Sequence, residues 1–181
     1  GDNAGSQAAN LTAVRAEILM EMNVGERVHI SKLETPSEKR EVSRRILADL
    51  GEWFGIPEAI ESYIDKSSSL PFWAAFDGVA SVGFIAVLKH FDKAAEICVM
   101  GVMEAYHRNG IGSLLLGEAE KWCADQGIAF LQVKTLSASH PDAHYAKTRE
   151  FYRSAGFIEL EEFPELWGSA NPCLLMIKEI S

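Results

Sequence analysis

A short turn containing two glycines is the part of this sequence best suited to chemistry. Residues 105–113 read Ala-Tyr-His-Arg-Asn-Gly-Ile-Gly-Ser. Glycine lets the backbone come close to a ligand, and the first N–H groups of a helix have no partner inside that helix. Arg108 would add a positive charge to such a site. Taken alone, the turn fits either a phosphate-binding site or an ordinary helix start.

The residues around the turn favour the phosphate site. An apolar run at 94–103 precedes it, and apolar residues recur at helical spacing after it. Gly127 stands where a left-handed helix cap is expected, and a second apolar run follows at 128–136. These features predict a strand–helix–strand unit with parallel strands. The turn then lies at the carboxyl end of the first strand, where open sheets usually bind ligands.

The remaining pattern predicts further helices and strands on both sides of this unit. A strand at 27–33 precedes a helix whose start, Thr35-Pro36-Ser37-Glu38, has the form of a capping box. A second helix begins at Pro57, and two strands meet at a hairpin turn on Asp77-Gly78. The last expected elements are a helix and two strands, at 145–155, 157–163 and 172–177.

The order of these elements predicts an α/β fold of the α+β kind. We expect a mixed, mostly antiparallel central sheet of about six to seven strands with helices on both faces. Residues 1–26 are interpreted as a flexible lead-in with a short helix, on which an apolar stripe runs from Leu11 to Met22. Residues 27–181 are interpreted as a single domain, since a chain of 181 residues suffices for one substantial core.

Composition and charge argue against several classes of protein. The formal net charge of −9 argues against general nucleic-acid binding, which needs a basic surface. No apolar run reaches the roughly 18 residues of a membrane span and no signal segment opens the sequence, so we expect a soluble, cytoplasmic protein. The three cysteines are widely separated among apolar neighbours, which predicts reduced thiols and neither disulfides nor a zinc cluster.

His140, Asp142 and His144 form a cluster that could suggest a metal or proton-relay site. Their spacing is not diagnostic of metal binding, and loop histidines are usually solvated or cap helices. We therefore expect no metal, and contact with a substrate is the preferred interpretation of this loop.

Two spaced motifs carry a resemblance to a known family. Residues 107–112, His-Arg-Asn-Gly-Ile-Gly, resemble the Gln/Arg-x-x-Gly-x-Gly/Ala signature of the GNAT superfamily of N-acetyltransferases, with His107 in place of the usual Gln or Arg. Residues 151–157, Phe-Tyr-Arg-Ser-Ala-Gly-Phe, resemble the aromatic-Tyr-x-x-x-Gly-Phe motif that often ends a helix in this family. The resemblance covers roughly 28–177, and the order of the predicted elements agrees with it.

The resemblance implies acetyl-CoA, or a similar acyl-CoA, as co-substrate. Its diphosphate would lie on the backbone N–H groups of the turn, since a diphosphate needs several convergent donors and little steric bulk. The strand before the turn would offer backbone groups to the pantetheine arm. Tyr145 and Thr148 stand where the family often has Asn and Ala, so local contacts would differ. The implied acetyl-CoA-binding residues are Met100, Gly101, Val102, His107, Arg108, Asn109, Gly110, Ile111, Gly112, Ser113, Tyr145 and Thr148.

Tyr152 and Glu96 are the candidate catalytic residues. Tyr152 matches the tyrosine that, in many family members, protonates or hydrogen-bonds the departing CoA thiolate, and a phenol can do this without being charged. On a regular strand Glu96 would face the same side as Met100 and Val102, where apolar neighbours would raise its pKa toward that of a useful base. In histone-acetylating members a Glu at the corresponding distance deprotonates the amine. Deprotonation through water, with Glu96 at the solvated start of the strand, is the alternative.

The resemblance, with the residues that match its motifs, implies an N-acetyltransferase that moves an acetyl group from acetyl-CoA directly to a primary amine of a small molecule or peptide. The alternative is a non-catalytic acyl-CoA sensor or interaction module on the same fold. The expected partner is the amine acceptor, with no nucleic acid, no membrane and a homodimer left open. Nothing in the sequence names the amine.

Overall fold

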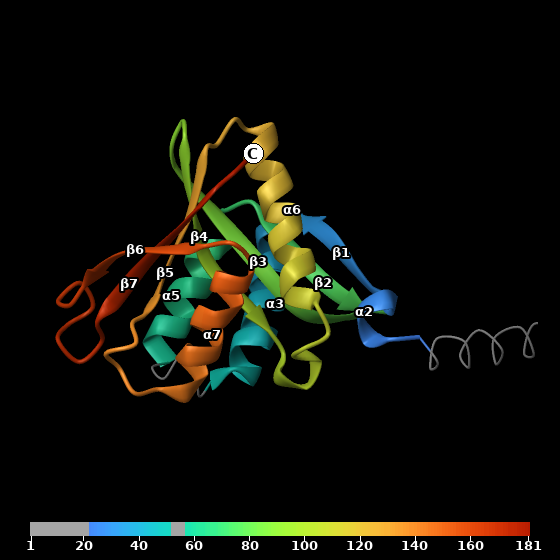
Figure 1. Ribbon diagram of the computed structural model, residues 1–181. Coiled ribbons are helices and arrows are strands. Elements are labelled where there is room, and N and C mark those ends of the chain that lie inside the picture. Colours follow the sequence, from blue (N-terminus) through green and yellow to red (C-terminus); the bar gives the residue numbers. More distant parts are fainter. Residues whose placement is uncertain (1–21, 52–56) are drawn as a thin grey trace, which may run out of the picture.

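Seven strands form one sheet in the computed structural model, which describes residues 22–51 and 57–181 (Figure 1). Their order is β1-β2-β3-β4-β5-β7-β6, and every neighbouring pair is antiparallel except β4 and β5. The predicted mixed, mostly antiparallel sheet and its parallel crossover are confirmed. The strands are β1 (Val28–Leu33), β2 (Phe72–Asp77), β3 (Ala80–Phe91), β4 (Ala94–Val102), β5 (Phe130–Leu136), β6 (Ile158–Phe163) and β7 (Cys173–Glu179).

Helices cover both faces of the sheet, as predicted (Figure 1). They are α2 (Val24–Arg27), α3 (Pro36–Asp49), α5 (Pro57–Ser67), the 3₁₀ turn η1 (Glu104–Tyr106), α6 (Ile111–Asp125) and α7 (Ala143–Ser154). Gly127 follows α6 with a φ of 68°, which confirms the left-handed cap expected there, and Gly156 follows α7 with a φ of 93°. The stripe expected from Leu11 onward falls outside the described residues, except for Met22.

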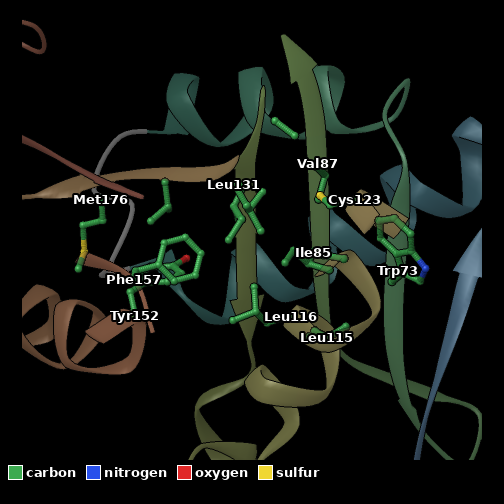
Figure 2. Packing of buried hydrophobic residues seen from close by; sticks show 14 of the residues in the cluster. Trp73, Ile85, Val87, Leu115, Leu116, Cys123, Leu131, Tyr152, Phe157 and Met176 are labelled. Atoms are coloured by element: carbon green, nitrogen blue, oxygen red, sulfur yellow. The ribbon is translucent and has the colours of Figure 1, made fainter. Parts of the chain in front are cut away.

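β3 separates two apolar clusters. Phe84 and Ala86 pack toward α3 and α5, whereas Ile85 and Val87 pack toward α6 and α7. Side chains alternate across a strand, so a strand that is apolar at successive positions is buried on both faces. Figure 2 shows the cluster on the α6 and α7 side, where residues of the sheet meet both helices.

β4 contains a bulge at Cys98. Ile97 and Val99 lie opposite consecutive residues of β3, which leaves Cys98 without an opposite residue in that strand. Ile97 and Met100 therefore pack in the same cluster, on the α6 and α7 side. In a regular strand, residues three apart would face opposite sides of the sheet.

Because of the bulge, Glu96 lies on the face of the sheet opposite to the one predicted. Met100 and Val102 follow the bulge and pack on the α6 and α7 side. Glu96 precedes it, next to Ile97, which also packs on that side, so the Glu96 side chain lies on the opposite face with α3 and α5. The predicted common face is wrong because the two-residue period of the strand is interrupted at Cys98.

β4 and β5 are paired over a short distance only. Their parallel ladder joins Ala94–Ile97 to 130–133 and then stops. Beyond it β4 continues along β3 as far as Val102, and β5 continues along β7 as far as Leu136. The two strands separate at the level of the bulge, and their facing edges have no ladder partner there.

Two local details differ from the prediction. The hairpin between β2 and β3 turns at Gly78-Val79, one residue later than expected, because Asp77 still belongs to β2. Of these two turn residues only Gly78 has a positive φ, 61°, which is typical of a type II′ turn. At the start of α3 the Thr35 hydroxyl donates to the Glu38 carboxylate and does not cap a backbone N–H group, so the predicted capping box is wrong.

The short helix α2 packs against the turn that precedes α6. A Cβ on Gly25 would stand 2.6 Å from the carbonyl oxygen of Asn109. Arg27 donates from Nε and Nη2 to the two carboxylate oxygens of Asp77, each at 3.1 Å, and the Tyr106 hydroxyl donates to the same carboxylate at 3.0 Å. Asp77 thus ties α2 and η1 to the β2–β3 hairpin.

Replacing Gly25 with alanine should destabilise this packing. The new methyl group would force the backbone at Asn109 to shift, so we expect the free energy of unfolding to fall by about 1–3 kcal/mol. Gly117→Ala in α6 is the matched control, because an added Cβ there meets nothing within 4 Å and alanine should stabilise the helix by about 0.5–1 kcal/mol. Urea unfolding of both variants measures the difference. A Gly25→Ala protein as stable as the control would contradict the described contact.

Candidate active site

A cavity of about 1450 Å³ opens where β4 and β5 separate. Tyr63 of α5 lines it on one face of the sheet, and Phe151 and Tyr152 of α7 line it on the other. Residues of β4 and β5 beyond their shared ladder form its middle. The cavity therefore crosses the sheet through the gap between these two strands.

The cavity brings together most of the residues predicted to bind a ligand. Asn109 and Glu96 are absent from its described lining, and both have other partners. Tyr152, the first candidate catalytic residue, is present. The predicted binding residues that line the cavity are Met100, Gly101, Val102, His107, Arg108, Gly110, Ile111, Gly112, Ser113, Tyr145 and Thr148.

The turn before α6 has the geometry of an anion site. Among the described residues, no side chain caps the first N–H groups of α6, which begins at Ile111 in the cavity wall. These groups lack partners within the helix and carry the positive end of its dipole. Arg108 is the one non-glycine residue with positive φ, 62°, in the described ranges 22–51 and 57–181. A strained backbone at this position is typical of a functional turn.

The two glycines of the turn are required for different reasons. Gly110 has a φ of 76°, and an added Cβ would meet nothing within 4 Å, so backbone conformation favours glycine there. A Cβ on Gly112 would stand 3.0 Å from Cε2 of Phe151. The close approach at Gly112 is thus made by a side chain of α7, which lets the two helices pack together beside the cavity.

The side chains of His107 and Asn109 stabilise the turn through hydrogen bonds to backbone carbonyl groups. Nε2 of His107 lies 2.6 Å from the carbonyl oxygen of Val102, so this nitrogen donates to the end of β4. Nδ2 of Asn109 donates to the carbonyl oxygens of Tyr106 and His107, at 3.2 and 3.0 Å. The amide of Asn109 holds the backbone and is not part of the cavity lining, so its predicted contact with a ligand finds no support in the structure.

Tyr152 lies almost fully buried among aromatic rings. It is 6% exposed, and its ring centroid is 5.2 Å from that of Phe151 and 5.3 Å from that of Phe157. Figure 2 shows Tyr152 beside Phe157 within the cluster on the α6 and α7 side. Burial raises the pKa of the phenol, which therefore stays protonated at neutral pH. A neutral O–H at the cavity wall can donate a hydrogen bond or a proton.

Glu96 is held by three polar side chains. Nζ of Lys134 lies 2.9 Å from both carboxylate oxygens, and Nε2 of His90 lies 2.5 Å from one of them. Gln132 donates at 3.3 Å. Burial acts to raise the pKa of Glu96, but hydrogen bonds from these three side chains and the charge of Lys134 outweigh it and lower the pKa below 4.5. The predicted raised pKa is wrong because β5 supplies an ion-pair partner.

Two residues that position α7 were not recognised in the sequence. The Asp142 carboxylate accepts from the backbone N–H groups of His144 and Tyr145, at 2.7 and 3.3 Å, and so caps the helix. Arg149 is 6% exposed and donates to the carbonyl oxygen of Leu136 at 2.8 Å. Asp before a helical stretch is a known start signal that could have been used, whereas nothing in the local pattern indicates a buried Arg.

The part of the chain that the structure describes contains no group of three or more His, Cys, Asp and Glu side chains arranged to hold a metal ion. Its helices are also too short or too polar to cross a membrane. Asp142, from the cluster considered for metal binding, serves as the cap of α7. All three cysteines are free thiols, with Cys98 half-buried at the bulge.

The ion pair of Glu96 should make the stability of the protein depend on pH. Because folding lowers the pKa of Glu96, its contribution is complete above the unfolded value near 4.5 and is lost as the pH falls through the lower folded value. Glu96→Gln should therefore be less stable than the native protein by about 1–3 kcal/mol at pH 7, with a smaller difference at pH 3.

Urea unfolding at the two pH values measures this difference. Glu118→Gln is the control, because Glu118 pairs with Lys121 on the surface of α6 and its loss should change stability by less than about 0.5 kcal/mol. A Glu96→Gln difference that stays constant from pH 7 to pH 3 would contradict the assigned ion pair.

Known proteins resemble this chain in sequence and in fold. Residues 34–157 match the family described as the acetyltransferase (GNAT) family. An uncharacterised N-acetyltransferase of Chlorobaculum tepidum is 27% identical over 135 residues, which are 73% of this chain and 79% of that protein.

Solved structures with the same fold include the following two examples. Ard1 from Thermoplasma volcanium has a TM-score of 0.67 and 18% identity, covering 86% of this chain and 99% of its own. An aminoglycoside 6′-N-acetyltransferase complexed with coenzyme A has a TM-score of 0.65 and 21% identity, covering 84% and 97%. Because the family match spans more than half of the sequence, the chain belongs to the GNAT acetyltransferase family.

Proposed function

We propose that this protein transfers an acetyl group from acetyl-CoA directly to a primary amine of a small molecule or peptide. The observation that carries the proposal is the cavity that crosses the sheet between β4 and β5, with the turn before α6 in its wall. Such a gap lets two reactants enter from opposite faces and meet, which removes much of the entropic barrier to a bimolecular reaction. Membership of the GNAT acetyltransferase family supports acyl transfer as the reaction.

Acetyl-CoA would enter on the side of α6. Its diphosphate would accept hydrogen bonds from the first N–H groups of α6, with Arg108 adding charge at the same end. Its pantetheine arm would follow the edge of β4 near Met100 and Val102, where β5 provides no ladder. The aminoglycoside acetyltransferase of similar fold was solved with coenzyme A, which supports this class of ligand.

The reaction needs a proton donor for sulfur and an acceptor for the amine proton. The amine nitrogen attacks the thioester carbonyl carbon, and the carbon–sulfur bond breaks as the amide bond forms. Tyr152 is assigned as the donor to the departing sulfur, because its phenol is buried and stays protonated. Glu96 lies outside the described cavity lining and is paired with Lys134, so we assign the amine proton to water.

The amine would approach from the side of α5. Tyr63, Cys98 and Lys134 contribute to the wall there. Cys98 lies at the bulge and Lys134 lies beyond the end of the β4–β5 ladder, so neither residue has a ladder partner across the gap between these two strands. Aminoglycosides are the substrates named for one protein of similar fold, and for this chain the proposal stays at the level of primary amines.

A non-catalytic acyl-CoA sensor is the second candidate. The pairing of Glu96 with Lys134 favours the sensor, because the carboxylate predicted as a catalytic base is engaged in this ion pair. Both candidates predict binding of acetyl-CoA, and only the enzyme predicts turnover.

Release of free CoA thiol tests the proposed function. Purified protein and acetyl-CoA are incubated with polyamines, aminoglycosides, amino acids and peptides with free N-termini, and acetylated product is identified by mass. Turnover with at least one amine supports the enzyme. Tight acetyl-CoA binding, measured by calorimetry, without turnover of any amine would favour the sensor. Absence of binding would contradict both.

Tyr152→Phe tests the assigned proton donor. Phenylalanine keeps the ring between Phe151 and Phe157, so the fold and the affinity for acetyl-CoA should remain nearly unchanged. Loss of the O–H should lower kcat about 10²-fold. Steady-state kinetics with the amine found above, together with calorimetry, measure both quantities. An unchanged kcat would remove the role assigned to Tyr152.

A further inference from the structure

Thr135 of β5 carries a buried hydroxyl that no described residue satisfies. The residue is 4% exposed, and Oγ1 is buried without a hydrogen-bond partner among residues 22–51 and 57–181. Most buried side-chain polar atoms in proteins have at least one partner. Thr135 also lines the cavity between β4 and β5, so a ligand in that cavity could supply the missing partner.

The position of Thr135 places it on the same face of the sheet as Tyr152. Thr135 lies opposite Leu174 of β7, and it alternates in phase with Val133. Both of those residues pack in the cluster on the α6 and α7 side, which also contains Tyr152. Thr135 follows Val133, the last β5 residue paired with β4, by two positions, so it stands where the gap between the strands has opened.

The fold itself does not account for a hydroxyl at this position. Valine has nearly the same shape as threonine, favours strands equally well and would leave no polar atom unpaired. Leu131 and Val133, which share the face of Thr135, are apolar and nearly fully buried. A threonine in place of valine on this face of β5 is therefore best explained by a ligand that enters the cavity and bonds to its hydroxyl.

We propose that Thr135 Oγ1 hydrogen-bonds an amide of the pantetheine arm of bound acyl-CoA, close to the thioester. This inference rests on the proposed function and adds a second hydroxyl to the reactive end of the site. A hydroxyl can donate to an amide carbonyl or accept from an amide N–H, and the pantetheine arm offers both groups. Thr135 acts here as a binding residue, and no bond to it forms or breaks.

Three proteins test the proposal: the native chain, Thr135→Val and Thr135→Ser. Each is titrated by calorimetry with CoA and with adenosine 3′,5′-diphosphate, which lacks the pantetheine arm. Thr135→Val should weaken CoA binding about three- to tenfold, the range expected for one neutral hydrogen bond. The binding of adenosine 3′,5′-diphosphate should be unchanged. Thr135→Ser keeps the hydroxyl and should retain most of the CoA affinity.

Thermal unfolding without ligand distinguishes a binding role of Thr135 from a structural one, because only loss of a structural hydrogen bond would lower the Tm. Because Oγ1 has no described protein partner, Thr135→Val should have a Tm equal to or above that of the native protein. Native-like CoA affinity of Thr135→Val would overturn the proposal. An equal loss of affinity for both ligands, or a lower Tm, would likewise overturn it. Failure of the native protein to bind CoA would overturn the proposed function as well.

Discussion

The parallel ladder between β4 and β5 ends at Ile97, and the candidate site depends on the separation of the two strands beyond that residue. A ladder that stops leaves the facing N–H and C=O groups of both strands to find other partners. The bulge at Cys98 lies at the same level, and bulges bend a strand and increase its twist. The separation of the two strands therefore follows from a local irregularity in β4, and the cavity is the space that results.

Interactions on both faces hold the strands at the point where they separate. On the α5 side, Lys134 reaches across from β5 to Glu96 of β4 at the last rungs of the ladder. On the other side, Ile97 and Val133 pack in the apolar cluster with α6 and α7. An ion pair on one face and apolar contacts on the other thus fix where the gap begins. This arrangement also explains why Glu96 is better suited to stabilise the gap than to accept a proton.

The turn before α6, proposed to bind phosphate, is held in place by hydrogen bonds to the backbone. Asn109 bonds to carbonyl groups within the turn, and His107 bonds to the end of β4. Asp77 ties the preceding η1 to α2 and the β2–β3 hairpin. The N-terminal end of α6 is therefore presented in a fixed orientation toward the cavity, as an anion site requires.

Periodicity in the sequence predicts the elements, whereas most of the candidate site was implied by the resemblance of two motifs to a known family. The apolar runs and the glycine that ends α6 predict the strand–helix–strand unit, because each of these signals is local. The side of Glu96 could not be predicted, since a bulge depends on pairing with another strand. Its lowered pKa depends on Lys134, which is distant in the sequence and adjacent only in the folded sheet. The unpaired hydroxyl of Thr135 is likewise a property of the folded environment.

We propose that acyl-CoA occupies the gap between β4 and β5 with its diphosphate on the first turn of α6. This placement can be tested by backbone amide NMR of the native protein during a titration with CoA. Binding in the gap should change the chemical shifts at the start of α6, near Gly112, together with those of Met100 in β4 and Thr135 in β5. Changes confined to other surfaces, or limited to the start of α6 with β4 and β5 unaffected, would contradict it.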